Sequence, residues 1–581
     1  MTGASGASSV TSSPLPKWQL ALAVAAPVAL GLGYMYYKNN TNNKPSSKSN
    51  RGKSKGSSKE NGTPATDKQI SIDIDYPPKS TSEPETLLEK AQKYKNEGNE
   101  QFKKGKFDEA ITQYNLAIEI CPKENTEVLA TFYQNRAAAY EQLKKYSAVK
   151  ADCTKALELK PKYAKALLRR ARAMEHCNDL ESALEDVTAA CILENFSNQT
   201  TILMADRVLK QLGRQHAMEH LANKKLIMPS KYFIKTYIST FPKDPVFVSL
   251  QNANDGNISQ GLLKVLESVK EQNYDDVIPL CNEELDSSEP NTLLHRMEVL
   301  LTRATFYLLL GQHDAAIEDL GTIIDNDSVS NGVKVNALIK RATLFMQLEN
   351  PEKSFCDFKM AAELDPECGD IYHHRGQVNL LMENIDEARE DFRKAVEFNP
   401  NFGVAFVQKC YADYRYGIVK RDMEVIREAM KGFEQAVEKF PDCPECYTLY
   451  AQMLSETQDY QKADRYFAKA IEKDPTNATV HVHRGLLQLQ WNADVDKAVE
   501  YINKALLLDD KCEYGYETLG TIEVQRGNLT EAIKLFDKAL ALGRTAMELT
   551  HIFSLRDAAK TQLTIKDKLG SSIMFNFQNV S

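Results

Sequence analysis

One set of residue positions recurs along most of the chain, and its period restricts the fold. Ala388 is followed four residues later by Phe392 and three residues after that by Ala395. Pro366 and Pro400 lie 34 residues apart. A period of this length indicates one small structural unit stacked repeatedly upon itself. Later copies of the triplet are Ala463, Phe467 and Ala470, and Ala532, Phe536 and Ala539.

The spacing of these residues predicts pairs of packed helices. Small residues let two helices approach closely, and the apolar stripe buries the second helix against its neighbours. The pattern resembles the tetratricopeptide repeat (TPR), which implies an all-α, right-handed superhelical solenoid whose first helices line the concave face. We count about eleven repeats, three within residues 86–195 and eight within 258–541. The copy around Tyr274, Val277 and Cys281 is weak, and an insertion is expected around Lys420 to Ile426.

The first 85 residues have a different composition. Residues 18–37, from Trp18 to Tyr37, contain no charge, and this length is sufficient for a transmembrane helix. The alternative is a cleaved secretory signal. Only Lys17 precedes the apolar stretch, whereas many lysines follow it, so we favour a single-pass anchor with its N-terminus outside the cytosol. Its short, moderately apolar character suits the outer mitochondrial membrane, although the endoplasmic reticulum would also be compatible.

Composition and repeats together divide the chain into seven segments. The stretch after the anchor is rich in Asn, Ser, Lys and Gly and is expected to be a flexible stalk. The expected segments are a short N-terminal segment (1–17), the anchor (18–37), the stalk (38–85), an N-terminal TPR block (86–195), a helical linker (196–257), a C-terminal TPR block (258–565) and a tail (566–581).

Five polar residues at inner-face positions of the first three repeats predict a binding site. Lys95 and Asn99 are four residues apart and share one helix face, as do Lys165 and Arg169, and Asn135 comes from the helix between them. Cations and amides that face one groove would bind a peptide with several carboxylates. Each residue alone is more often a solvated side chain. The five identities are similar to those of TPR proteins that dock the acidic EEVD tails of cytosolic chaperones, which implies a carboxylate clamp.

The order of anchor, stalk, three clamp repeats, middle segment and eight further repeats resembles one family as a whole. The segment with Met228, Phe233, Ile234 and Tyr237 and the late run from Gly520 to Gly527 add to the resemblance. That family is the large TPR import receptor subunits of the translocase of the outer mitochondrial membrane (the TOM complex). It implies a cytosolic receptor with its N-terminus in the intermembrane space. Its implied partners are chaperones of the 70 and 90 kDa classes, preproteins such as metabolite carriers, and other TOM subunits.

The same resemblance implies a preprotein groove in the C-terminal block. A groove for basic amphipathic helices needs apolar contacts together with acidic groups. Glu445 and Glu517 fall at inner positions of first helices, and Tyr411, Tyr447 and Tyr514 lie nearby in the sequence of those repeats. Aromatic residues at such spacing more often belong to repeat packing, and this alternative stays open.

Charge and cysteine usage restrict the remaining classes. The net charge of −8 divides into about +6 for residues 1–80, about +4 for 81–250 and about −18 for 251–581. The acidic second half argues against nucleic acid and favours basic polypeptides, or simply solubility. The 11 cysteines show no disulfide-like spacing and are expected as reduced thiols in a cytosolic domain.

No catalytic or metal-binding pattern is found, so we predict no enzyme activity, no cofactor and no metal. Cys443 and Cys446 form a lone CxxC that lacks two further zinc ligands, and a redox motif would need a preceding strand. We therefore expect structural thiols there, and the pair His373 and His374 is an equally weak signal. Two further functions stay open, an anchored co-chaperone scaffold on another membrane and a TPR subunit that targets an enzyme.

Overall fold

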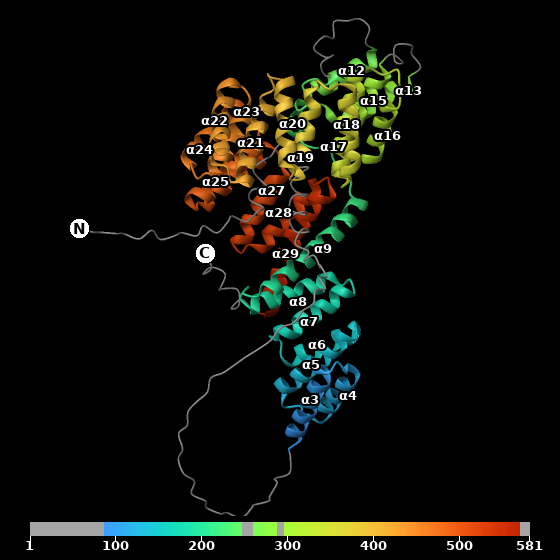
Figure 1. Cartoon of the computed structure of the whole chain (residues 1–581), viewed down its shortest axis with the longest axis vertical. Helices are drawn as coiled ribbons and strands as arrows, with labels where there is room; N and C mark the ends of the chain where they lie inside the picture. Colours follow the sequence, from blue (N-terminus) through green and yellow to red (C-terminus); the bar gives the residue numbers. More distant parts are fainter. Residues whose placement is uncertain (1–85, 247–258, 288–294, 570–581) are drawn as a thin grey trace, which may run out of the picture. The chain divides into compact units, whose positions relative to one another are not determined.

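The computed structural model describes residues 86–246, 259–287 and 295–569, and every regular element in these ranges is a helix (Figure 1). These residues form two compact units that divide at residue 206 of the sequence. The expected anchor, the stalk and the end of the tail lie outside the described residues. No helix within the described ranges has the length and apolar character needed to span a bilayer.

The N-terminal unit contains three antiparallel helix pairs, as the repeat count predicted. The first helix begins with a capping box, in which Thr86 and Glu89 satisfy each other's backbone N–H groups. Gly98 lets the two helices of the first pair come close, because a Cβ there would lie 2.7 Å from the ring of Tyr114. The helices are α3 (Leu87–Lys103), α4 (Phe107–Ile120), α5 (Thr126–Gln142), α6 (Tyr146–Leu159), α7 (Ala164–His176) and α8 (Leu180–Leu193).

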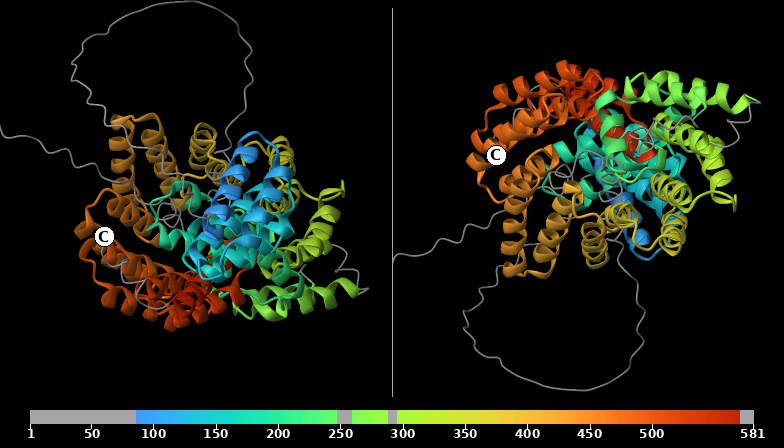
Figure 2. Two further views of the ribbon diagram at one scale, coloured as in Figure 1. Left: turned by 90° about the horizontal axis from the view of Figure 1, so that it is seen from below. Right: turned by 90° about the horizontal axis from the view of Figure 1, so that it is seen from above.

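The C-terminal unit contains the eight further pairs. Its helices follow one another around a curve (Figure 2), and the last two contact His216 and Lys224, near the start of this unit in the sequence. They are α12 (Gln260–Lys270), α13 (Val277–Asp286), α15 (Arg296–Leu310), α16 (His313–Ile324), α17 (Asn331–Gln347), α18 (Pro351–Leu364), α19 (Gly369–Leu381), α20 (Ile385–Phe398), α21 (Gly403–Lys420), α22 (Met423–Lys439), α23 (Pro444–Glu456), α24 (Tyr460–Lys473), α25 (Ala478–Asn492), α26 (Val495–Leu508), α27 (Glu513–Gln525), α28 (Leu529–Leu542) and α29 (Ala546–Leu569).

The weak repeat and the repeat with the insertion differ from the others in the lengths of their helices. In the weak copy, a 3-10 turn (η2, Tyr274–Asp276) precedes α13, which has only 10 residues. The insertion lengthens α21 to 18 residues and α22 to 17, whereas α23 and α24 have 13 and 14. The inserted residues therefore extend both helices and leave their pairing intact.

The segment expected as one helical linker is divided between the units. Helix α9 (Gln199–Asn223) runs across residue 206, and α10 (Lys231–Ser239) follows it. In the C-terminal unit, His216 of α9 lies 2.8 Å from Asp557 of α29, and Lys224 donates to the carbonyl of Leu540. Residues 206–246 are thus part of the C-terminal unit.

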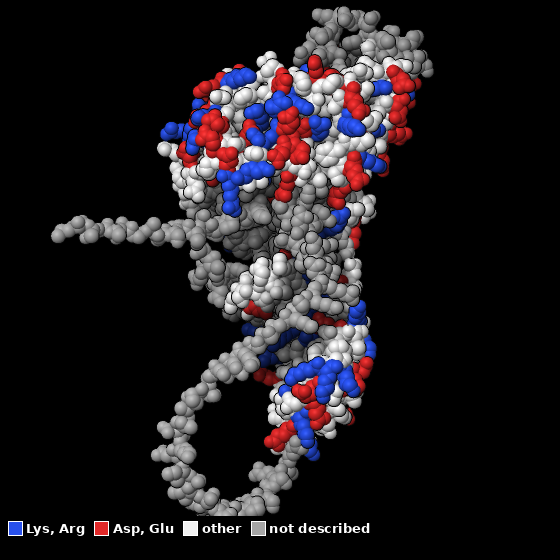
Figure 3. Space-filling view, viewed as in Figure 1, with Lys and Arg blue, Asp and Glu red and all other residues white. Residues whose placement is uncertain are grey.

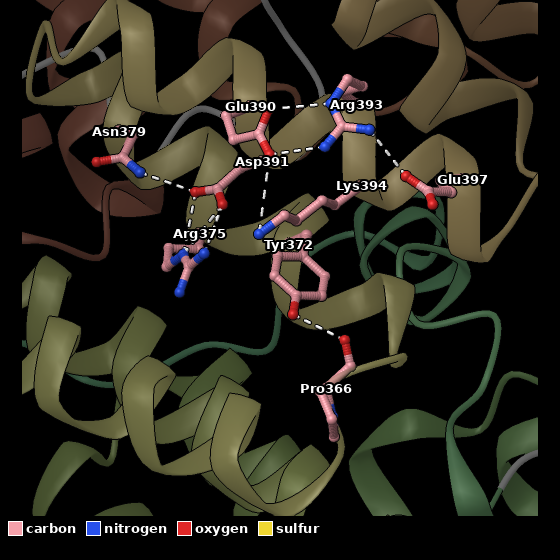
Figure 4. A network of polar contacts seen from close by, with 9 residues as sticks. All are labelled: Pro366, Tyr372, Arg375, Asn379, Glu390, Asp391, Arg393, Lys394 and Glu397. Carbon is pink, nitrogen blue, oxygen red and sulfur yellow. Dashed lines mark hydrogen bonds and ion pairs between the residues drawn. The ribbon is translucent and has the colours of Figure 1, made fainter.

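A buried ion pair recurs within the repeats. An arginine on the first helix donates to an aspartate 16 residues later on the second helix, and each aspartate is buried. Figure 4 shows one example, in which Asp391 accepts from Arg375 and from Asn379. Such charge-assisted bonds fix how the two helices of a repeat face each other. The pairs are Arg136–Asp152, Arg170–Asp186, Arg303–Asp319, Arg341–Asp357 and Arg375–Asp391.

Candidate functional site

The five predicted clamp residues lie on the first helices of three successive repeats. Lys95 and Asn99 are on α3, Asn135 is on α5, and Lys165 and Arg169 are on α7. The structure brings the two amides together, because Asn135 Nδ2 donates to Asn99 Oδ1 at 3.2 Å. The same oxygen accepts from the Tyr114 hydroxyl at 2.8 Å. With its oxygen held twice, the Asn99 amide is oriented so that its NH2 group is left to donate.

Arg169 is held in place by α5, the helix that also supplies Asn135. Its Nε donates to Glu141 Oε2 at 2.8 Å and its Nη1 donates to the carbonyl of Gln134 at 3.3 Å. Arg172 approaches the other oxygen of Glu141 at 3.4 Å. The guanidinium is therefore partly neutralised by a carboxylate of its own chain, which the repeat pattern did not predict.

The two lysines of the clamp differ in exposure. Lys95 is half-buried and Lys165 is exposed. Neither ammonium group has an ion pair or a hydrogen bond within the described residues. Helices α3 and α7 thus each carry a lysine whose ammonium group is left for a ligand, and α3 and α5 carry the amide pair, which is the chemistry that an acidic peptide requires.

Of the predicted groove residues on α21 and α23, the two tyrosines are buried in repeat packing and the glutamate is only half-buried. Tyr447 is buried, and its hydroxyl donates to the carbonyl of Pro441 at 3.1 Å, so it takes part in repeat packing. Tyr411 is also buried and accepts from Arg415 Nη1 at 3.0 Å. Beside Arg415, burial raises the pKa of Glu456 to about 7. Glu445 is half-buried at the start of α23, where its Oε2 accepts from the Cys443 thiol at 3.4 Å.

Glu517 and Tyr514 belong to an acidic cluster at the end of the solenoid. Glu517 Oε1 lies 3.1 Å from His551 Nε2 of α29, and its carboxylate raises the pKa of that histidine against the lowering effect of burial. Burial and the neighbouring Glu548 hold the pKa of Glu513 well above its ordinary value. The hydroxyl of Tyr514 is buried, and none of the described residues gives it a hydrogen-bond partner. The nearby Arg544 and Lys224 oppose the rise in the pKa of Glu513, so basic groups accompany the carboxylates at this end of the solenoid.

Sequence reasoning missed that residues 228–246, here called the inner segment, pack against first helices of the C-terminal repeats. The Phe241 ring stacks on His374 of α19 at 4.3 Å, and Asp244 receives a 2.8 Å bond from Lys340 of α17. Farther along, Lys511 donates to the carbonyl of Met228. The helical spacing of Ile234, Tyr237, Phe241 and their apolar neighbours was a signal that this stretch has a buried face.

The inner segment also reaches the predicted groove residue Glu445. Burial, followed by the nearby Glu445 carboxylate, raises the pKa of Tyr232. The Arg544 guanidinium lies over the Phe233 ring at 3.9 Å. The inner segment thus covers part of the surface on which preproteins were expected to bind.

The outer face of the C-terminal repeats shows no single-sign patch in the view drawn. Figure 3 shows Lys and Arg interspersed with Asp and Glu over the surface of α18–α24. Many of these are pairs within one helix, such as Arg393 with Glu390 at 2.7 Å. Mixed charge of this kind keeps a surface soluble and does not select a partner. Among the described residues, no group of three or more His, Cys, Asp or Glu side chains is arranged to hold a metal.

Comparison with known proteins assigns the family. TPR patterns match four stretches, one described as TPR repeat at residues 98–144 and three described as tetratricopeptide repeat at 130–163, 369–402 and 444–477. The rat mitochondrial import receptor subunit TOM70 is 43% identical over 571 residues, which cover 96% of this chain and 93% of the relative. The chain belongs to the TOM70 family.

A further TOM70 relative matches nearly the whole length as well. The human TOM70 protein is 43% identical over 577 residues, with 96% of this chain and 93% of the relative covered. The crystal structure of yeast Tom70 covers 82% of this chain and 96% of its own, with 25% identity and a TM-score of 0.48. Because the rat and human sequences each match 96% of this chain, the TOM70 relationship includes both repeat blocks and the inner segment between them.

Proposed function

We propose that this chain is an outer mitochondrial membrane receptor that docks chaperones and receives the preproteins they carry. In this proposal the 18–37 segment anchors the chain, with its N-terminus in the intermembrane space and the repeats in the cytosol. Chaperones of the 70 and 90 kDa classes dock through acidic EEVD tails on the N-terminal repeats. The C-terminal repeats bind hydrophobic preproteins with internal targeting signals, such as metabolite carriers, for transfer to the TOM complex. Its relatives are named mitochondrial import receptor subunits.

One observation carries the chaperone part of this proposal. Asn99 and Asn135 meet at 3.2 Å across two repeats, and the cations of α3 and α7 belong to the same run of first helices. The terminal carboxylate and an Asp side chain of the tail would be bound by these groups. Each charge-assisted bond contributes roughly 1.5–3 kcal/mol before the cost of ordering the peptide, which supports micromolar binding.

Calorimetry with an EEVD-ending peptide tests the clamp. Arg169→Ala in the full chain is expected to weaken binding by more than about tenfold, because a bidentate donor to a carboxylate is lost. Arg172→Ala is the matched control, since it removes the same kind of charge beside the same Glu141 but outside the five predicted residues. A peptide with an amidated end should also bind weakly. Equal affinity of Arg169→Ala and wild type would reject the clamp.

The preprotein part rests on the acidic groups of first helices α23 and α27. Glu445 and Glu517 are acidic residues on first helices that also carry Tyr447 and Tyr514, and acidic groups beside aromatic ones suit a basic amphipathic targeting helix. The covering inner segment implies that a preprotein displaces part of it or binds beside it. Tyr411 and Tyr447 support this surface indirectly through packing, whereas Tyr514 lies next to the acidic cluster.

Fluorescence anisotropy with a basic targeting peptide tests this surface. Glu445→Lys is expected to lower the affinity for the targeting peptide several-fold, while the affinity for the EEVD peptide stays unchanged. Glu438→Lys, the same charge change on the exposed face of α22, is the control and should bind as wild type does. If Glu445→Lys and wild type bound the targeting peptide equally, the groove would lie elsewhere.

A further inference from the structure

Two cysteines come together at the start of α23. Cys443 is the cap residue before the helix and Cys446 is the third residue within it. Residues three apart in an α-helix have Cα atoms about 5 Å apart, within the range of about 4.4–6.8 Å that a disulfide spans. Cys443 itself precedes the helix, and the Cys446 N–H donates to its carbonyl at 3.2 Å, so the turn at the start of α23 brings the two residues close together.

Both sulfur atoms lie against the same glycine of the preceding repeat. The Cys446 thiol donates to the carbonyl of Gly403 at 3.5 Å. The Cys443 sulfur lies 3.2 Å from the position that a Cβ on Gly403 would occupy. Because Gly403 has no side chain, the two sulfurs and the ring of Phe440 can pack closely against the start of α21.

The two thiols differ in access. Cys446 is buried, whereas Cys443 is half-buried and donates to Glu445 Oε2 at 3.4 Å. An accessible first thiol and a buried second thiol are the arrangement in which a reagent from solution reacts with one sulfur and the other completes an internal bond.

This arrangement is absent from the comparable repeats. Cys368 and Cys512 occupy the same cap position before α19 and α27. Three residues later these repeats have Ile371 and Gly515, so neither cap cysteine has a second thiol within its own helix start. A cysteine at the cap position is thus shared by three repeats, whereas the second cysteine three residues later occurs only in α23 among these three.

We propose that Cys443 and Cys446 form a reversible dithiol–disulfide site that exchanges with small disulfides of the glutathione class. Cys443 gives up its proton to water and its thiolate attacks one sulfur of the oxidised glutathione. The S–S bond of that molecule breaks, and one glutathione thiolate leaves. Cys446 then gives up its proton to water and attacks Cys443, which releases the second glutathione thiolate. Two electrons pass from the protein to the disulfide, and two protons return to the two glutathione thiolates.

The protonation behaviour agrees with these roles. The contact with Cys443, followed by burial, holds the pKa of the Cys446 thiol far above its ordinary value. Cys446 therefore stays protonated until Cys443 has reacted, so Cys443 is the attacking group and Cys446 the resolving group. Formation of the disulfide would also remove the hydrogen bond that Cys443 donates to Glu445.

Mass spectrometry after oxidation tests the site directly. The full chain is incubated with oxidised glutathione, free thiols are blocked, and the tryptic peptide of residues 440–462, in which Cys443 and Cys446 are the only cysteines, is weighed. The wild-type peptide should lose the mass of two hydrogen atoms, and dithiothreitol should reverse this loss. Its oxidation should be roughly tenfold or more faster than modification of Cys512. Cys446→Ser should stop at a glutathione adduct on Cys443, and Cys443→Ser should leave the peptide unmodified.

Other outcomes would overturn the proposal. If the wild-type peptide stayed reduced, or accumulated only the glutathione adduct, the two thiols would be structural. Equal modification of Cys443→Ser and wild type would remove Cys443 from the reaction. The wild-type result involves no substitution, so it does not depend on whether a variant folds. Circular dichroism of each variant checks its fold. Cys512→Ser serves as the matched variant and should oxidise at residues 440–462 as wild type does.

Discussion

The Nε of Arg169 donates to Oε2 of Glu141 at 2.8 Å, so the clamp's guanidinium is tied to a carboxylate of the neighbouring repeat. This bond has two opposing effects on an acidic ligand. It fixes the guanidinium in one orientation, which lowers the entropy cost of binding. It also places a like charge close to where the carboxylates of the ligand would bind, which repels them.

Replacement of Glu141 by glutamine separates these two effects. Glu141→Gln keeps an oxygen that can accept from Arg169 but removes the negative charge. We expect the affinity for an EEVD-ending peptide to rise by about two- to fivefold at low salt, and the gain to shrink as salt is added. Calorimetry at two salt concentrations checks this. Weaker binding by Glu141→Gln would show that orientation by the carboxylate outweighs its repulsion.

Asp391 and Glu390 are adjacent residues with very different roles (Figure 4). Asp391 is buried and accepts from Arg375 and Asn379, whereas Glu390 pairs with the exposed Arg393. Asp391→Ala should lower the free energy of unfolding by roughly 2–4 kcal/mol, because the half-buried Arg375 loses its partner. Glu390→Ala should leave stability nearly unchanged, since exposed pairs contribute little. Urea denaturation of the full chain compares them, and equal stabilities would contradict the assigned role of the buried pair.

Much of this architecture could be predicted from the sequence because the information is local and repeated. A 34-residue period specifies helix pairs, and inner-face positions follow from helical spacing, so the sequence alone indicates the five candidate clamp residues. The Arg–Asp pairs could also have been found, since an arginine followed 16 residues later by an aspartate recurs in five repeats. That spacing was overlooked because it joins two helices and no single-helix pattern contains it.

The position of the inner segment could not be predicted in the same way. Asp244 and Lys340 are separated by 96 residues, and neither has a counterpart in the other repeats that would reveal the contact. Burial of the helical face of α10 was inferable, but the helices that cover it were not. The tie between Arg169 and Glu141 was missed for the same reason, since it depends on the rotation of one repeat against the next.

The buried pair Lys340–Asp244 is expected to hold the inner segment against α17. Both side chains are only 2% exposed. Lys340→Met should lower the free energy of unfolding by about 3–5 kcal/mol, because the buried Asp244 loses the ammonium group that donates to its Oδ2. Adding Asp244→Asn to that variant should recover most of the lost free energy of unfolding. Lys334→Met, whose partner Asp327 is fully exposed, is the control and should show no measurable change. A double variant as unstable as Lys340→Met would contradict this account.

Asp370 predicts a pH dependence of the contact between α19 and the inner segment. Burial raises its pKa to about 6, although Lys243 N–H donates to its carboxylate at 3.3 Å. In the unfolded chain an aspartate titrates near about 4, so the folded state binds the proton first as pH falls. The free energy of unfolding of the wild type, measured relative to that of Asp370→Asn, should therefore be about 1–2 kcal/mol higher at pH 5 than at pH 7.5. This gain should be lost as pH rises through 6. Urea denaturation at both pH values measures it. The fully exposed Asp327→Asn should show no such change, and a pH-independent difference for Asp370→Asn would mean that this carboxylate is already ionised at pH 5.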